Sequence, residues 1–236
     1  GERGIGELKT PIELPHLQDV SSYSLQVDYR RAMTAVQELL AKVSFDHLLT
    51  EQIVPAAYPP IIPIGSYSVQ NLLSRRWHGE FQIISEHGSG LRSSLGAFAR
   101  RDEVKSAYYL NQADKLTADS WGAFGHLEWR IAPHWLLNAG AFFEDYELVG
   151  GRLSPRVTLH WQPSPRHAWR LGISRAYRNP VLLETSASLI RDVLGPTGLS
   201  LGLPPTQPYI VDSGNVEPDN LFSREIGSLV QWPDQG

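Results

Sequence analysis

Residues 121–145, WGAFGHLEWRIAPHWLLNAGAFFED, carry the clearest structural signal in the chain. Apolar and polar side chains alternate over 121–130 and again over 135–145, with Pro133 between the two runs. Alternation with period two is typical of a β-strand whose two faces meet different surroundings. A short connection that contains proline is typical of a turn. The segment therefore predicts two antiparallel strands joined as a hairpin.

The same alternation continues through 155–162 and 168–178, and the prolines of the connection 163–166 belong outside a strand ladder. Four consecutive strands with tight turns predict an antiparallel meander. Further strands are expected, with less regular patterns, at 25–30, 75–85, 90–101, 104–110 and 221–232. Together with a strand near residue 40, alternation predicts about ten strands.

Two parts of the sequence are harder to interpret. In 31–46 the apolar residues fit helical spacing, but from Glu38 onward they also alternate, and we favour a strand there. The proline-rich stretch 50–65 and the stretch 186–220, rich in glycine and proline, show no period. We expect both to be loops, although loops of this length in a small domain indicate either a function or an incorrect assignment.

Composition excludes several classes of protein. The 236 residues contain no cysteine, so disulfides, a thiolate nucleophile and a cysteine–zinc site are excluded. The net charge of −4 argues against a nucleic-acid-binding protein, which normally has a basic surplus. No apolar run reaches the ~18 residues of a membrane-spanning helix. The chain begins with Gly1 and shows no signal segment, so we expect a processed product or a piece of a longer protein.

Two β designs explain the alternation. A soluble sandwich turns its apolar face inward, whereas a transmembrane barrel turns it toward lipid and lines its lumen with polar residues. The polar faces here mix glycine, serine, asparagine, histidine and charged residues, and some connections are short while others are long, as in a barrel. Aromatic residues recur near strand ends, where interfacial girdles lie: Trp121, Trp129, Trp135, Trp161, Trp169, Tyr177 and Trp232.

The second half of the chain resembles the β-barrel of TonB-dependent outer-membrane receptors. The similar pieces occur in the family's order: Glu128-Trp129, Gly140 to Asp145, Leu153 to Arg156 (LSPR), Gln162 to Pro165 (QPSP), Ser174 to Pro180 (SRAYRNP), and Gly214 to Ser228 (GNVEPDNLFSREIGS). The last block departs from the family pattern. It lacks the usual leucine before its proline, and Asp219 stands where glutamate is common.

The resemblance implies an all-β fold, an antiparallel meander that forms part of a transmembrane β-barrel in the outer membrane. Family members import scarce ligands, usually ferric siderophores, with energy from the TonB–ExbB–ExbD system, and their 22-stranded barrels enclose an N-terminal plug. We find neither a plug nor a TonB box in this sequence. We therefore expect residues 1–236 to be a barrel segment whose partners are TonB–ExbB–ExbD, outer-membrane lipid and lipopolysaccharide, and an iron chelate, but not nucleic acid.

Several polar residues could carry chemistry, but a simpler role is expected for each. His126 and Glu128 share a face, and His160 and His78 also lie on polar faces, as metal ligands or more simply as lumen residues. Glu144 and Asp145 are adjacent, point to opposite faces and cannot form a catalytic pair. Other candidates are Asp212, Asn215, Glu217 and Asp219 (an oxygen-rich turn without calcium-loop spacing), Ser174 (no GxSxG motif), and Gly88 and Gly90 (no complete phosphate loop). Arg170, Arg175 and Arg178 are predicted to cluster near a strand end, where they could contact lipopolysaccharide or an anionic ligand or, more simply, be solvated or belong to a lumen network.

We therefore predict a receptor or transporter and not an enzyme, with no catalytic residue, no metal ligand and no cofactor site. Two other interpretations stay open at this stage. A soluble β-sandwich that binds a ligand would need a second layer over the tryptophan face. A β-rich hydrolase would need a nucleophile or an acid pair, which the sequence does not provide.

Overall fold

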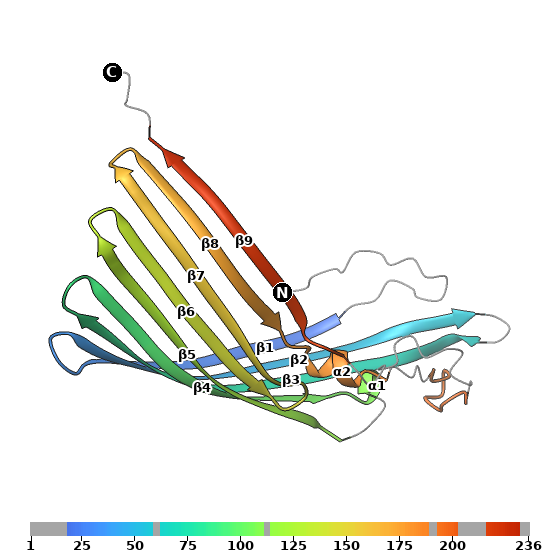
Figure 1. Ribbon diagram of the computed structural model, residues 1–236. Coiled ribbons are helices and arrows are strands. Elements are labelled where there is room, and N and C mark those ends of the chain that lie inside the picture. Colours follow the sequence, from blue (N-terminus) through green and yellow to red (C-terminus); the bar gives the residue numbers. More distant parts are fainter. Residues whose placement is uncertain (1–17, 59–61, 111–113, 189–192, 203–215, 232–236) are drawn as a thin grey trace, which may run out of the picture.

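The computed structural model describes residues 18–58, 62–110, 114–188, 193–202 and 216–231. They form one nine-stranded antiparallel sheet in which each strand pairs with the next along the chain. The strands are β1 (Gln18–Ala32), β2 (Gln37–Tyr58), β3 (Ile62–His87), β4 (Leu91–Lys105), β5 (Leu116–Ala132), β6 (Trp135–Tyr146), β7 (Gly150–Ser164), β8 (His167–Arg178) and β9 (Asp219–Val230). The sheet is curved, and two short helices, α1 (Ala107–Leu110) and α2 (Leu182–Ser186), lie on its concave side (Figure 1).

The strand register sorts the side chains into two faces with one simple rule. Directly paired residues of antiparallel strands project to the same face. In β1 to β8 odd residues pair with odd and even with even, except at bulges beside the β5–β6 and β7–β8 turns. In β9 the phase changes, because Ser174 pairs with Ser223. We call the face of the even residues of β1–β8 and the odd residues of β9 the inner face, and the opposite one the outer face.

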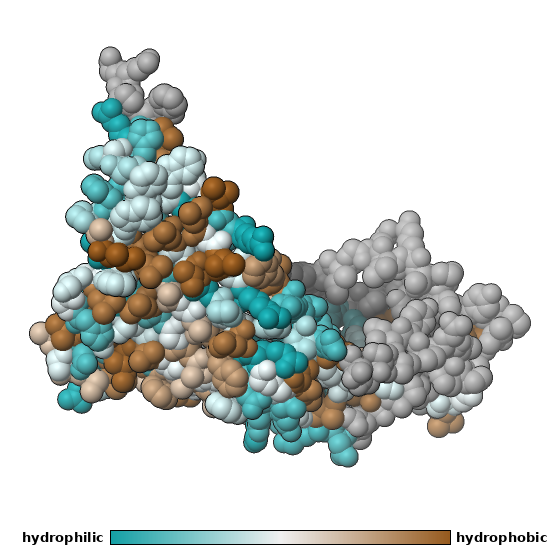
Figure 2. Space-filling model, in the orientation of Figure 1, coloured by the Kyte–Doolittle hydropathy of each residue, from teal (hydrophilic) through white to brown (hydrophobic). Residues whose placement is uncertain are grey.

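The outer face is apolar. All six tryptophans among the described residues belong to it, and each is between 38 and 56% exposed. The segment from Trp121 to Trp129, both included, is nine residues of β5, and a barrel strand needs about 9–11 residues to cross a bilayer. Figure 2 shows hydrophobic residues gathered in a band across the strands, with paler and hydrophilic residues on both sides of it. The pattern matches the lipid-facing band of a barrel and its aromatic girdles.

The residues that follow the aromatic girdle on the outer face are charged. Arg101 and Asp119 form a two-point ion pair next to Trp121, and Glu103 binds both Arg75 at 3.3 Å and Lys115 at 2.9 Å. Charged groups belong outside the hydrocarbon layer, because a charge in the layer costs several kcal/mol. The change from indoles to ion pairs therefore marks one boundary of the apolar band.

The connections differ between the two ends of the sheet. Four short turns lie at one end of the sheet, which we call the turn end: β1–β2, β3–β4, β5–β6 and β7–β8. The opposite side, the loop end, has the connection with α1 between β4 and β5 and the long connection with α2 between β8 and β9. The predicted meander of 121–178 and the predicted contrast between short and long connections are confirmed.

The predicted loop at 50–65 is wrong, because most of it belongs to β2 and β3. The partner strand β1 begins at Gln18, which pairs with Gln52, so β2 has no neighbour on that side beyond Gln52 among the described residues. Pro55 lies in this unpaired part and pairs only with Tyr67 of β3. A proline is tolerated at such an edge because the missing N–H has no ladder partner to lose.

The prediction of a strand at 104–110 is also wrong. The strand β4 ends at Lys105, and 107–110 form the single turn of α1. The hydroxyl of Ser106 accepts a hydrogen bond from the Tyr109 amide at 2.9 Å, which is the bond of a helix N-cap. The same hydroxyl donates to the carbonyl of Asn71 at 2.5 Å and so ties the helix to β3.

Other expectations are confirmed or restricted by the structure. The strand favoured from Glu38 is confirmed, since β2 begins at Gln37. The number of strands is nine in the described residues, and Trp232 lies outside them. The sandwich interpretation is not supported, because the described residues form one sheet and the tryptophans stay exposed. Neither described helix has the length and apolarity needed to span a membrane.

Candidate functional site: the inner face

Three stacked phenylalanines cross the middle of the inner face. The rings of Phe98 and Phe142 lie 5.3 Å apart and those of Phe124 and Phe142 6.5 Å apart, all nearly parallel. They lie over Gly96 and Gly122, where a Cβ atom would come within 2.3 Å of the Phe124 ring and 2.6 Å of the Phe98 ring. Aromatic rings that cover glycines in this way protect the strand backbone. This phenylalanine ridge divides the inner face into a loop half and a turn half.

A chain of ion pairs crosses the loop half. Arg76 of β3 binds Asp102 of β4 at 2.6 Å, and Arg100 binds Asp102 at 3.1 Å and Glu144 of β6 at 3.2 Å. The chain ends at Asn179, just after β8, whose amide donates to Glu144 at 2.9 Å. All of the charged groups except the exposed Arg76 are partly buried, and the bond from Arg76 to Asp102 is a charge-assisted hydrogen bond, which is stronger than a neutral one. The chain therefore ties β3, β4 and β6 to the start of the long β8–β9 connection.

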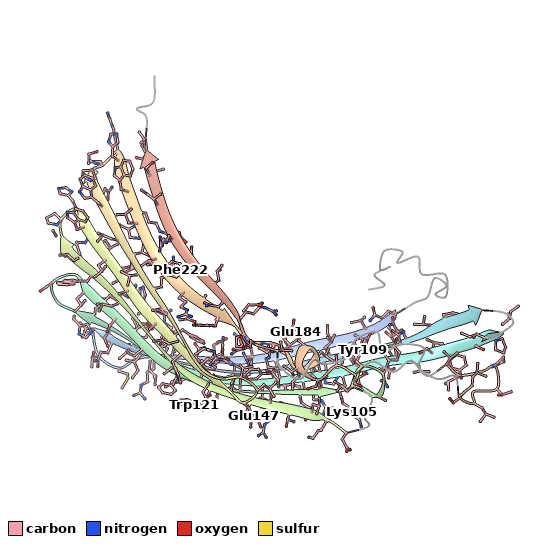
Figure 3. The ribbon with its side chains drawn as sticks, turned by 45° about the vertical axis from the view of Figure 1, so that its right-hand side comes forward. Lys105, Tyr109, Trp121, Glu147, Glu184 and Phe222 are labelled. Atoms are coloured by element: carbon pink, nitrogen blue, oxygen red, sulfur yellow. The ribbon has the colours of Figure 1, made fainter. Side chains whose placement is uncertain are left out.

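Two described parts of that connection, 179–188 and 193–202, form what we call the strap. The strap leaves β8, places α2 beside α1 and reaches β3, where Leu194 and Tyr67 exchange two backbone hydrogen bonds of 2.8 and 2.9 Å. The amide of Ser188 also donates to the carbonyl of Tyr109 at 2.9 Å. Figure 3 shows Glu184 and Tyr109 on the concave side of the sheet and Trp121 on its other side. The strap thus crosses the inner face at the loop end.

An apolar cluster holds the two helices against the sheet. It consists of Val104, Leu110, Ala118, Tyr146 and Leu182, all less than 8% exposed. Burial raises the pKa of the Tyr146 phenol, and the carboxylate of Asp102 adds to this rise. The cluster is the one place in the described residues where buried apolar side chains form a core, so it fixes the strap in position.

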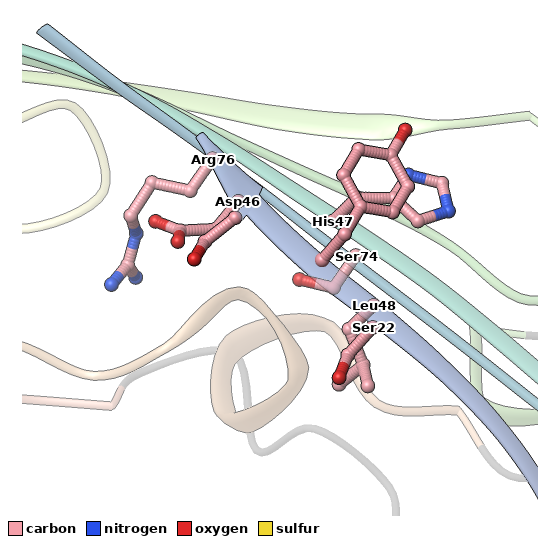
Figure 4. Close-up of a pocket in the computed structure, with 8 residues that line it drawn as sticks. Ser22, Asp46, His47, Leu48, Ser74 and Arg76 are labelled. Atoms are coloured by element: carbon pink, nitrogen blue, oxygen red, sulfur yellow. The ribbon is translucent and has the colours of Figure 1, made fainter. Parts of the chain in front are cut away.

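A polar hollow of about 590 Å³ lies on the loop half of β1 to β3. Its inner-face residues are Ser22, Ser24, Asp46, Leu48, Ser74 and Arg76. Figure 4 shows the Asp46 and Arg76 side chains extending to the same side of these strands. A hydroxyl donates and accepts hydrogen bonds, a carboxylate accepts them and a guanidinium donates them, so the hollow can bind a polar ligand. We call it the upper hollow.

A second, smaller cavity of about 250 Å³ lies in the turn half. The residues around it are His126, Asn138, Ala139, Gly140, Arg156, Thr158, His160 and Arg170, from β5 to β8. Arg170 binds Glu225 of β9 at 3.0 Å. We call this the lower cavity.

The histidines considered as metal ligands are only partly brought together. His126 and His160 line the lower cavity, and Glu128 follows on the same face of β5. His78 lies in β3 beside Glu80, at 3.4 Å, and on the Phe98 ring. Among the described residues, no three His, Asp or Glu side chains meet in an arrangement that could hold a metal ion.

The predicted arginine cluster is wrong. Arg170 and Arg178 lie eight residues apart on β8, about 26 Å at 3.3 Å per residue, and Arg175 projects to the outer face between them. Arg178 instead binds Asp219 at 2.8 Å and Glu184 of the strap at 3.2 Å, and these bonds raise its pKa. Arg175 lies over the Tyr177 ring at 4.8 Å.

The remaining candidates have structural roles. Glu144 faces inward into the ion-pair chain and Asp145 outward, as their adjacency predicts. Ser174 faces inward between Arg156 and Ser223, and Gly88 and Gly90 form the β3–β4 turn. In the oxygen-rich segment, Asp219 begins β9 and Glu217 precedes it, while Asp212 and Asn215 lie outside the described residues.

Sequence reasoning missed the upper hollow and the ion-pair chain. Arg76, Arg100 and Glu144 occupy even positions of predicted strands, so the alternation places them on one face. Other members lie just outside the predicted ranges: Ser22, Ser24, Ser74, Asp102 and Asn179. What the alternation does not provide is the register, which decides that Arg76 lies opposite Asp102 and that Arg100 reaches Glu144.

A family profile described as "TonB dependent receptor-like, beta-barrel" matches residues 15–234. A search of curated protein sequences gives no match.

Solved structures with the same fold include two receptors from Pseudomonas aeruginosa. A mutant of the ferric enterobactin receptor PfeA is 15% identical, with a TM-score of 0.63 over 92% of this chain and 33% of its own. The siderophore receptor PirA is 13% identical, with a TM-score of 0.60 over 91% and 44%. PirA from Acinetobacter baumannii is 14% identical, with a TM-score of 0.63 over 92% and 33%. The chain thus spans less than half the length of each of these proteins.

Proposed function

Because the chain belongs to the family of TonB-dependent receptor-like β-barrels, we propose that it forms part of the wall of a receptor that takes up a scarce ligand of the ferric siderophore class. The observation that carries the proposal is the separation of the two faces. An apolar outer face with aromatic girdles suits lipid, and a polar inner face suits a water-filled or protein-filled lumen.

The protein lies in the outer membrane, like the other members of its family. In the part of the chain that the structure describes, the sheet has a free edge at β1 and another at β9. Unpaired backbone groups are not tolerated in hydrocarbon, so both edges need partners in the membrane. We propose that residues 1–236 are one segment of a larger closed barrel, whose further strands complete the wall and whose lumen holds a plug.

The loop half of the inner face is the region we propose for ligand contact. The upper hollow offers three serine hydroxyls, the Asp46 carboxylate and the Arg76 guanidinium on one wall. Siderophores carry many oxygen atoms and often a negative charge when they hold iron, so hydroxyl and guanidinium donors suit them. The strap crosses the same end of the lumen and narrows the route to the turn half.

The family consists of receptors and transporters, and we propose that this chain likewise binds and transports without chemistry. Energy would come from the TonB–ExbB–ExbD system acting through a segment outside this sequence. The further partners we propose are outer-membrane lipid and lipopolysaccharide, which would meet the outer face.

Uptake by whole cells tests the proposal. A receptor-deficient host that produces the complete receptor with this segment should accumulate radioactive iron from ferric enterobactin, since enterobactin is the ligand in a complex of PfeA. The accumulation should stop in a host without TonB. If a panel of ferric siderophores gives no TonB-dependent accumulation, the proposed function is wrong. Heat-modifiable migration on a gel shows in parallel that the barrel is assembled.

A further inference from the structure

We propose that the lower cavity is an oxyanion-binding site, which takes a phosphate or carboxylate group on the barrel wall. The site is separate from the upper hollow, because the phenylalanine ridge lies between them. It therefore does not depend on which ligand the receptor imports.

The cavity exists because large and small residues alternate across the strands. The register places His126, Gly140 and Arg156 in one row and Asn138, Thr158 and Gly172 in the next. Gly140 and Gly172 have only a hydrogen atom where other residues have a side chain, so a space stays open on the inner face at these two positions. A Cβ atom at Gly140 would come within 3.0 Å of the Gly125 carbonyl oxygen, so this opening is built into the backbone packing. A volume of about 250 Å³ has room for a tetrahedral oxyanion and some of its water.

The groups around the cavity are mainly hydrogen-bond donors. The guanidinium groups of Arg156 and Arg170 can each bind an oxyanion with two N–H bonds. Asn138 offers an amide, Thr158 a hydroxyl, and a histidine ring an N–H. Thr158 is 3% exposed and lies at the floor. Such a set of donors converging on one space suits a group that only accepts hydrogen bonds.

The acids near the cavity do not neutralise these donors. On β5 to β9 the turn half of the inner face has three arginines, Arg130, Arg156 and Arg170, against two carboxylates, Glu128 and Glu225. Glu225 is bound to Arg170, but the Nε of Arg170 is buried without a hydrogen-bond partner in the described residues. No described residue forms an ion pair with Arg156. An added oxyanion would satisfy both guanidinium groups.

Two sources could supply the oxyanion, and one protein preparation distinguishes them. The complete receptor that contains this segment is assembled in the outer membrane, purified in detergent and titrated with inorganic phosphate at low ionic strength. For a site that takes free oxyanions we expect saturable binding that weakens at least tenfold in Arg156→Gln. Arg152→Gln is the matched control, because Arg152 lies four residues along the same strand and face but outside the cavity.

A site already filled by an acidic side chain of polypeptide inside the barrel would leave no room for phosphate. The variant Arg156→Lys places an amine there, and carbodiimide then joins the amine to any carboxylate in contact with it. Mass spectrometry should find a cross-link from residue 156 of this variant to a carboxylate other than those of Glu128 and Glu225. The wild type should give no cross-link from residue 156.

Either result supports the proposal, and each identifies one source. The absence of both, or equal loss of phosphate binding in the Arg156→Gln and Arg152→Gln variants, would overturn it. Heat-modifiable migration confirms that each variant is assembled. Neither measurement requires transport, so a failure here leaves the uptake proposal standing, and a failure of uptake leaves this one standing.

Discussion

The two faces of this sheet are built from the same strands, yet they follow opposite rules. On the outer face neighbouring side chains belong to the same class: apolar residues lie beside apolar residues, and aromatic rings mark the ends of the apolar band. On the inner face many polar groups have a particular partner, as in the chain from Arg76 to Asn179. The comparison teaches that the outer face needs only a residue class, whereas the inner face needs a particular residue at each register position.

A charge placed on the outer face should have the largest effect. Leu95 is 64% exposed and pairs with Gly125, the midpoint between Trp121 and Trp129. We expect Leu95→Arg to lower the free energy of unfolding in lipid by about 2–4 kcal/mol. The matched variant Ser94→Arg puts the same charge on the inner face and loses one hydrogen bond from Gln82, about 0.5–1.5 kcal/mol.

Urea unfolding in vesicles measures both variants. If Ser94→Arg proves as costly as Leu95→Arg, the assignment of the outer face to lipid fails.

A methyl group placed under the phenylalanine ridge should have the next largest effect. A Cβ atom at Gly122 would meet the Phe143 carbonyl oxygen at 2.2 Å and the Phe98 ring at 2.6 Å. Overpacking of this kind costs about 1–3 kcal/mol, so Gly122→Ala should unfold at lower urea concentration. Gly79→Ala is the control on the outer face, where a Cβ atom meets nothing within 4 Å, and we expect no measurable loss there.

The adjacent acids at the end of β6 allow a smaller, local comparison. Glu144→Gln removes the charge that holds Arg100 and Asn179, whereas Asp145→Asn changes the outer face only. We expect amide exchange in 179–188 to rise about tenfold, equal to ~1.4 kcal/mol of local opening, in the first variant. Hydrogen-exchange mass spectrometry measures it. Equal exchange in the Asp145→Asn variant would show that the ion-pair chain does not hold the strap.

The smallest effect is expected from the exposed ion pair of Arg101 and Asp119. The hydrogen bonds from Arg101 lower the pKa of Asp119 below its ordinary value. A lowered folded-state pKa means that the pair stabilises the fold above the unfolded-state pKa, and that this contribution disappears as pH falls through the folded-state pKa. Asp119→Asn should therefore melt slightly below the wild type at neutral pH and together with it in strong acid. Added salt should narrow the neutral-pH difference.

Much of the fold follows from the pattern of the sequence. The alternation in 121–178 predicts the meander, its turns and the face of every tryptophan in it, because a strand turns successive side chains to opposite sides regardless of its neighbours. It fails where the local signal is weak or mixed. Residues 50–58 contain proline that an unpaired edge tolerates, and 104–110 alternate although Ser106 caps a helix turn.

The candidate site was much less predictable. His126 and His160 could be placed on one face, but not in one cavity, and Arg170, Arg175 and Arg178 seemed close although β8 separates them. The partners of Arg100 and Asn179 come from strands and a strap that are distant in sequence. Alternation carries no information about such partners.

Local sequence pattern is enough to establish that the strands of this chain have two different faces, one of them apolar with aromatic ends. The reason is local: the pleat of a single strand separates its side chains. Only the tertiary structure decided that the apolar face stays uncovered, that the strap crosses the concave side, and which charges meet. These features depend on the register and the curvature of the sheet, and both are set by the pairing between strands.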